Sequence, residues 1–152
     1  MKRILVLILA IAVAAGFAAA SHARSVAASS PRSGVLHVAK ECSAYTGLAG
    51  SFCTITSSNL NAIDVGSRIV YAQAAGPGSL DSDIVLDTGH GNNTASGHVT
   101  LDFASGSGLV TFSGGTGRFT GFQASAVVSF DPATGLWHWD GTYSFSPSRD
   151  KQ

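Results

Sequence analysis

A recurring alternation of apolar and polar residues, broken by glycine-rich turns, constrains this chain more than any other feature. Period two is typical of β-strands, and no apolar stripe of period 3.6 indicates a helix beyond residue 34. Eight strands are therefore predicted. They cover residues 35–42, 51–58, 67–74, 82–87, 97–103, 108–112, 121–130 and 136–145.

The connections between these segments are short, so neighbouring strands are expected to form consecutive antiparallel hairpins. A sheet of this kind removes its exposed edges by closing on itself. The sequence thus predicts an all-β fold, an eight-stranded antiparallel up-and-down barrel over residues 34–147. A barrel of eight strands has an interior that is either filled by side chains or holds one small ligand.

The start of the chain has the order of a secretory signal peptide. Two basic residues precede an apolar run at 4–20, and the small residues Ser21 and Ala23 then mark a cleavage site. An uncleaved membrane anchor is the alternative, because a run of this length is close to the minimum for a span. We predict a signal peptide at 1–23, a flexible leader at 24–33 and a tail at 148–152. The processed protein is then secreted, periplasmic or extracellular, and free of the membrane.

The charge and the cysteine content of the chain further narrow the class of protein and its possible partners. Without Lys2 and Arg3 the chain keeps seven basic and nine acidic residues, and no basic patch indicates nucleic acid as a partner. Cys42 and Cys53 flank a segment with turn glycines, and in an oxidising compartment such a pair is expected to form a disulfide. A metal or nucleophile pair is the alternative, but the nearby sequence lacks partners for it.

The stretch "FSGGTGRFTGFQA" at 112–124 resembles a phosphate-binding loop only in its glycines. It lacks the lysine and the following helix that such a loop requires. We therefore predict that Gly114, Gly115 and Gly117 form a tight turn between two strands, that Arg118 fixes this turn by pairing with a carboxylate or carbonyl group, and that Gly121 kinks the next strand.

The longer segment "FSGGTGRFTGFQASAVVSF" resembles the Gly-Gly-Thr-Gly-Arg/Lys-Phe segment of the allene oxide cyclase and dirigent barrels, which are calycin-like. The segments "GSFCTITSSN" and "WDGTYSF" are similar to small exported bacterial proteins grouped with them, and the resemblance spans residues 34–145. It implies a barrel that holds an apolar reactive molecule and steers its cyclisation or coupling without a cofactor. Related plant proteins form trimers, so the resemblance allows a homo-oligomer.

Candidate site residues follow from the strand faces. His37 and Glu41, the latter the only glutamate in the chain, share one face of the first strand. They form an acid/base pair if that face points inward, and are solvated residues if it points outward. Glu41 is also the candidate for the barrel-lining glutamate of the resembled family. The residues predicted to line a ligand cavity are Phe122, Ala124, Ala126, Trp137, Trp139 and Tyr143.

Four polar residues of 87–102 have side chains that could bind a metal, namely Asp87, His90, His98 and Asp102. Nothing in their spacing makes them converge, so no metal is expected. Three functions remain open at this point. The first is an exported barrel that binds a small apolar ligand, the second is a cofactor-independent cyclase or isomerase, and the third is a structural or partner-binding secreted protein with a filled barrel.

Overall fold

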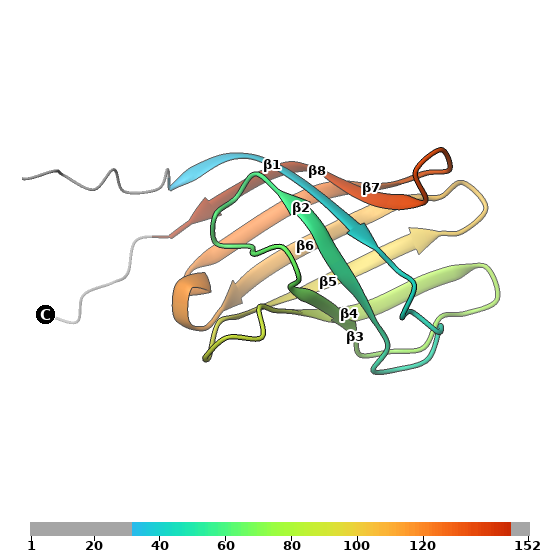
Figure 1. The fold of residues 1–152 in the computed structure, drawn as a ribbon, viewed down its shortest axis with the longest axis horizontal. Coiled ribbons are helices and arrows are strands. Elements are labelled where there is room, and N and C mark those ends of the chain that lie inside the picture. Colours follow the sequence, from blue (N-terminus) through green and yellow to red (C-terminus); the bar gives the residue numbers. More distant parts are fainter. Residues whose placement is uncertain (1–31, 147–152) are drawn as a thin grey trace, which may run out of the picture.

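Eight consecutive antiparallel strands close into a barrel in the computed structural model, which describes residues 32–146 (Figure 1). Hydrogen bonding runs in chain order, and β8 returns to pair with β1. The strands are β1 (Ser33–Glu41), β2 (Phe52–Ser58), β3 (Arg68–Tyr71), β4 (Ser79–Asp87), β5 (Thr94–Asp102), β6 (Ser107–Gly115), β7 (Phe122–Asp131) and β8 (Leu136–Phe145). The predicted all-β, eight-stranded up-and-down barrel is confirmed.

The ends of the chain limit what the structure says of the predicted segments. The predicted signal peptide, residues 24–31 of the leader and the tail at 148–152 all lie outside the described residues. Ser33, the last residue of the predicted leader, already belongs to β1. Within the described range, no helix has the length and apolar character needed to cross a membrane.

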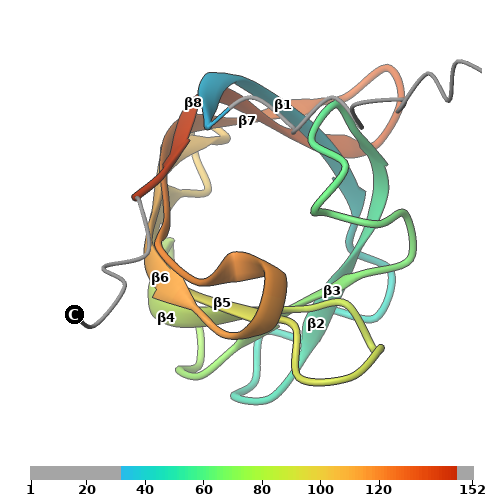
Figure 2. The ribbon, with the colours of Figure 1, turned by 90° about the vertical axis from the view of Figure 1, so that its left-hand side faces the viewer.

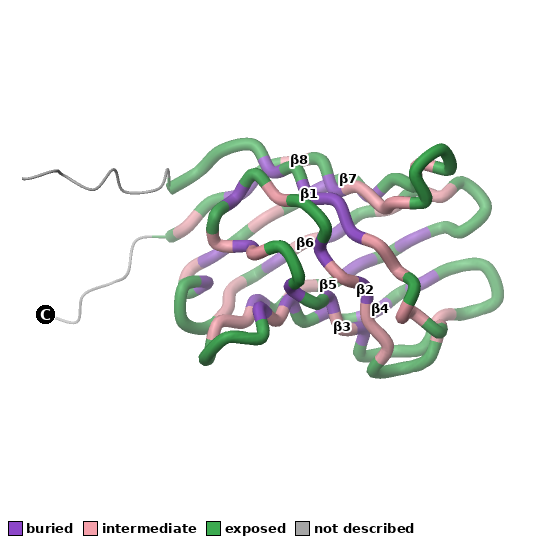
Figure 3. The backbone as a smooth tube through the Cα atoms, viewed as in Figure 1, coloured by how far each residue is buried: buried purple, intermediate pink, exposed green. Residues whose placement is uncertain are grey.

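Alternation along the strands produces the core. Buried and exposed positions follow one another along β4, whose Ile84 and Leu86 are almost fully buried (Figure 3). Ile69 and Tyr71 of β3 lie inside in the same way. Because each strand contributes one apolar face to the interior, closure of the sheet gathers these faces into a single core.

One end of the barrel is closed by connecting segments. Phe119 of the 3-10 turn η1 (Gly117–Phe119) is fully buried, and its ring centroid lies 5.4 Å from that of Phe122. Leu60 and Ile63, from the connection between β2 and β3, are buried in the same core. Figure 2 looks onto this end and shows η1 curling over the lower part of the opening.

The glycine-rich stretch spans the end of β6 and the start of η1, so Gly114 and Gly115 are the last strand residues and Gly117 opens the 3-10 turn. Gly114 and Gly117 have positive φ angles of 138° and 56°. A side chain at Gly115 would overlap the carbonyl oxygen of Thr94 on the neighbouring strand, so this position needs close backbone approach. The guanidinium of Arg118 pairs with the carboxylate of Asp64, which joins η1 to the connection between β2 and β3.

Replacement of Arg118 by Ala is expected to lower the free energy of unfolding by less than about 1 kcal/mol, because both partners of this ion pair are partly exposed. Urea denaturation of the variant, of Asp64→Ala and of the double variant measures the coupling. A loss several times larger would show that the pair determines the closure of this end.

Candidate functional site at the Lys40 end of the barrel

A lysine is buried near the last residues of β1, opposite the start of β8, whereas η1 lies at the other end of the barrel, between β6 and β7. Leu36, Val38 and Lys40 occupy alternate positions of β1 and are all buried, and Lys40 keeps only 4% of its surface exposed. Its Nζ donates a hydrogen bond to the Tyr71 hydroxyl at 2.9 Å and lies 3.6 Å from Sγ of Cys42. Lysine is rarely buried unless it is paired, so this position is unusual.

Aromatic rings surround the Lys40 amine. Its Nζ lies 5.6 Å from the ring centroid of Tyr71, 5.7 Å from that of Trp137 and 5.6 Å from that of Trp139. Such rings attract an ammonium group, but no carboxylate of residues 32–146 forms an ion pair with it. Burial without a counter-charge lowers the pKa of Lys40 to about 7, so a large fraction of the amine is uncharged at neutral pH.

The disulfide between Cys42 and Cys53 lies next to Lys40 and Tyr71. Cys42 and Cys53 are bonded, as predicted, and Cys53 is buried. The Tyr71 hydroxyl donates to Sγ of Cys53 at 3.4 Å, so a hydrogen-bonded series runs from Lys40 through Tyr71 to the disulfide. Burial and the neighbouring Tyr45 raise the pKa of Tyr71, which therefore keeps its proton.

A small cavity of about 40 Å³ adjoins the Lys40 amine. Its lining includes Tyr45, Tyr71, Leu80, Phe103 and Trp137. This volume exceeds what one water molecule needs but is far below the several hundred Å³ of a pocket for a whole ligand. The cavity therefore has room for a polar head group and leaves the body of any ligand outside.

The rim of this end is aromatic, and we call Tyr45, Phe103, Phe130 and Trp137 the mouth. Phe103 and Phe130 keep 40% and 42% of their surface exposed. Phe130 packs on Trp137, with ring centroids 4.8 Å apart. Exposed aromatic rings beside a buried polar group are the arrangement that binds an apolar molecule with one polar end.

The predicted ligand-lining residues lie mostly elsewhere in the core. They are Phe122, Ala124, Ala126, Trp137, Trp139 and Tyr143. All six belong to the core or pack against it, and Trp137 alone among them lines the cavity at Lys40. Beside the two alanines the rings of Phe112 and Phe122 pack at 5.6 Å, so side chains occupy this part of the interior.

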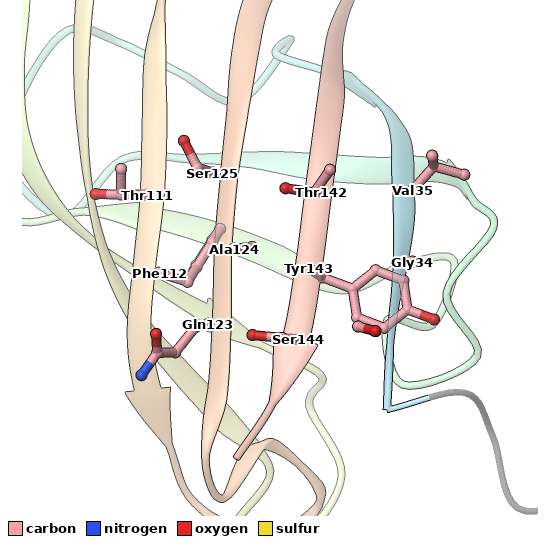
Figure 4. A pocket seen from close by; sticks show the side chains of 11 residues that line it. Gly34, Val35, Thr111, Phe112, Gln123, Ala124, Ser125, Thr142, Tyr143 and Ser144 are labelled. Atoms are coloured by element: carbon pink, nitrogen blue, oxygen red, sulfur yellow. The ribbon is translucent and has the colours of Figure 1, made fainter.

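Ala124 and Tyr143 also border a shallow depression of about 750 Å³ over β6, β7, β8 and β1 (Figure 4). Its lining combines apolar side chains, such as the exposed Val35, with several hydroxyl groups. Thr111, Ser125 and Thr142 stand opposite one another on adjacent strands and form a row of hydroxyl groups. No charged side chain lines this depression, so it offers weaker recognition than the Lys40 end.

His37 and Glu41 do not form an interior acid/base pair. The His37 side chain is 60% exposed, and its Nδ1 lies 2.6 Å from Oδ1 of Asp140. The Glu41 carboxylate accepts a hydrogen bond from the backbone N–H of Ser43 at 2.8 Å, and bonding to Ser43 lowers its pKa. The inward positions of β1 belong to the opposite face, which holds Lys40.

The four residues considered for a metal site make separate contacts. His98 lies between Asp83 and Asp81, at 2.9 and 3.0 Å, and hydrogen bonding to Asp83 raises its pKa. His90 bonds the carbonyl oxygen of Thr88. Asp87 and Asp102 accept backbone N–H groups in turns. No group of three or more potential metal ligands occurs in the described part of the chain.

Lys40 was not predicted, because the candidate residues His37 and Glu41 lie on the other face of β1. The signal was present, since Lys40 continues the register of Leu36 and Val38 and so interrupts an apolar face. Comparison with known proteins adds no relative, because no protein-family model, curated protein or solved structure matches the chain. Function must therefore be inferred from the geometry of the Lys40 end.

Proposed function

We propose that this barrel binds a small apolar molecule at its mouth, with a polar head group directed at Lys40. The observation that carries the proposal is a buried lysine with no carboxylate partner in the described part of the chain, beside a head-group-sized cavity rimmed by exposed aromatic rings. A buried amine of this kind is stabilised when a ligand supplies the missing polar partner. The proposed site at the mouth therefore differs from the cavity predicted from the sequence, which would lie deeper in the barrel.

Two further points support a binding protein of this kind. The disulfide fits an oxidising compartment and hence a secreted protein. The resemblance of residues 112–130 to the allene oxide cyclase and dirigent barrels fits an apolar ligand. Cyclase activity rests on that resemblance alone, and the exposed Glu41 does not favour it, so we propose binding and not turnover.

The test uses the fluorescent dye anilinonaphthalene sulfonate, which has an apolar body and an anionic head. We expect one saturable site, and displacement of the dye by cinnamyl alcohol, cinnamate or cinnamaldehyde, which share one body and differ in the head group. Phe130→Ser is expected to weaken dye binding about tenfold, the equivalent of removing about 1.4 kcal/mol of apolar contact. Fluorescence titration measures the affinity.

Leu109→Ser is the matched control. Leu109 is 46% exposed, close to the 42% of Phe130, but it lies on β6 outside the mouth. Equal loss in both variants would mean that the dye binds apolar surface in general. No saturable binding by the folded protein would overturn the proposal and favour a filled barrel that acts through its outer surface.

A further inference from the structure

We propose that Lys40 captures apolar aldehydes as an imine, so that the ligands of the mouth include aldehydes held covalently and reversibly. This inference rests on the proposed function, because the aldehyde must first dock its apolar body on the mouth. What points to it is the position of Lys40, which lines the cavity, and the lack of any ion pair to its amine among residues 32–146.

Imine formation requires an uncharged amine. An ordinary lysine holds less than about one part in a thousand of its amine uncharged at neutral pH. Burial lowers the pKa of Lys40 to about 7, which removes most of this disadvantage. Desolvation in an apolar pocket is an established way in which proteins make a lysine nucleophilic.

The surroundings of Nζ also suit the product. The rings of Tyr71, Trp137 and Trp139 keep water from the amine, and limited access of water slows hydrolysis of an imine. The hydrogen bond to Tyr71 holds Nζ at one place, and the phenol keeps its proton at neutral pH. The cavity accepts a carbonyl group, whereas the aromatic rim contacts the rest of the molecule.

The step is balanced without any oxidant or reductant. The Nζ lone pair forms a bond to the carbonyl carbon, and the π electrons of the carbonyl move to its oxygen. A proton from nitrogen reaches that oxygen and gives a carbinolamine. The C–O bond then breaks, the oxygen leaves as water with the second amine proton, and a C=N bond remains. Aldehyde and amine thus give one imine and one water.

Reductive trapping of the full chain tests this inference. The protein is incubated with cinnamaldehyde and sodium cyanoborohydride at neutral pH, and peptide mapping by mass spectrometry locates the reduced adduct. The chain has two other lysines, Lys2 and Lys151, and Lys151 is the reference within the same molecule. We expect Lys40 to be labelled at least about tenfold faster than Lys151, because more of its amine is uncharged.

Two controls and a pH profile make the result specific. In the denatured chain both lysines should react at equal rates. In Lys40→Arg the adduct at this position should vanish while labelling of Lys151 is unchanged. The rate at Lys40 should level off above neutral pH, whereas the rate at Lys151 should keep rising with pH.

The outcomes separate the two proposals. If cinnamyl alcohol displaces the dye but Lys40 is labelled no faster than Lys151, the imine is wrong and the binding site stands. If none of the three cinnamyl compounds displaces the dye and Lys40 is not labelled, both proposals fail. If Lys40 is labelled fast and cinnamyl alcohol blocks this labelling, the result supports both proposals.

Discussion

Between about pH 7 and pH 10, the free energy of unfolding should rise by about 4 kcal/mol more in the native sequence than in Lys40→Met. In the folded protein the pKa of Lys40 is about 7. In the unfolded chain a lysine has its ordinary pKa of about 10.4. In this window the unfolded state therefore binds a proton that the folded state does not, and stability rises with pH wherever this holds. Each of the about three pH units contributes about 1.4 kcal/mol.

Urea denaturation at a series of pH values measures the effect. Methionine fills a similar volume without a titratable group, so the difference between the two curves isolates Lys40 from every other group that titrates. Below neutral pH both states of the native sequence bind the proton, and the difference should become constant. Parallel curves over the whole range would show that the folded protein keeps Lys40 charged, and the nucleophile proposed for imine formation would lose its basis.

The strands could be predicted because their signal is local. Period-two alternation marks each strand and its inward face, as at Ile84 and Leu86, and short glycine-rich connections imply neighbouring antiparallel pairs. Closure of the sheet into a barrel could then be predicted, because a closed sheet has no exposed edge strands. The structural role of Gly114 and Gly117 could also be predicted from a local signal. The stretch lacks the lysine and the following helix that a phosphate-binding loop requires.

The first strand shows where local alternation fails. One face of "VLHVAKEC" carries His37 and Glu41 and the other carries Lys40, so each face mixes apolar and polar residues. Pairing with β8 decides between them. Val38 lies opposite Trp139 and Lys40 opposite Trp137, and both tryptophans face the interior. That contact joins the first and last strands of the sheet, so the alternation within β1 alone does not decide which face is inward.

The position of the cavity was equally non-local. Ala124 and Ala126 were among the residues predicted to line a cavity, but the volume around them is taken by rings from other segments, such as Phe112 and Phe119. Phe119 comes from a connecting turn, whose path the alternation of strands does not determine. Packing of this kind depends on the summed volumes of distant side chains, so the site could be found only in the structure.

Loss of the disulfide should lower the free energy of unfolding by about 2–3 kcal/mol, because the bond closes a short loop in the unfolded chain. Cys42 and Cys53 are separated by 11 positions. Urea denaturation of the oxidised protein and of protein refolded with dithiothreitol measures the difference. The reduced protein is the best comparison, since it keeps both sulfur atoms beside Lys40 and Tyr71. A loss below about 1 kcal/mol would contradict the expectation.

Dye binding should change far less than stability when the disulfide is reduced. The loop between the cysteines is also held by backbone hydrogen bonds, from Gly50 N–H to the Tyr71 carbonyl at 2.7 Å and from Ala75 N–H to the Gly47 carbonyl at 2.9 Å. Tyr45 of this loop packs edge-on against Tyr71, with centroids 4.8 Å apart. These contacts keep the wall of the mouth in place in the folded state, so the bond acts mainly on the unfolded chain. A tenfold loss of dye affinity on reduction would show instead that the disulfide itself shapes the mouth.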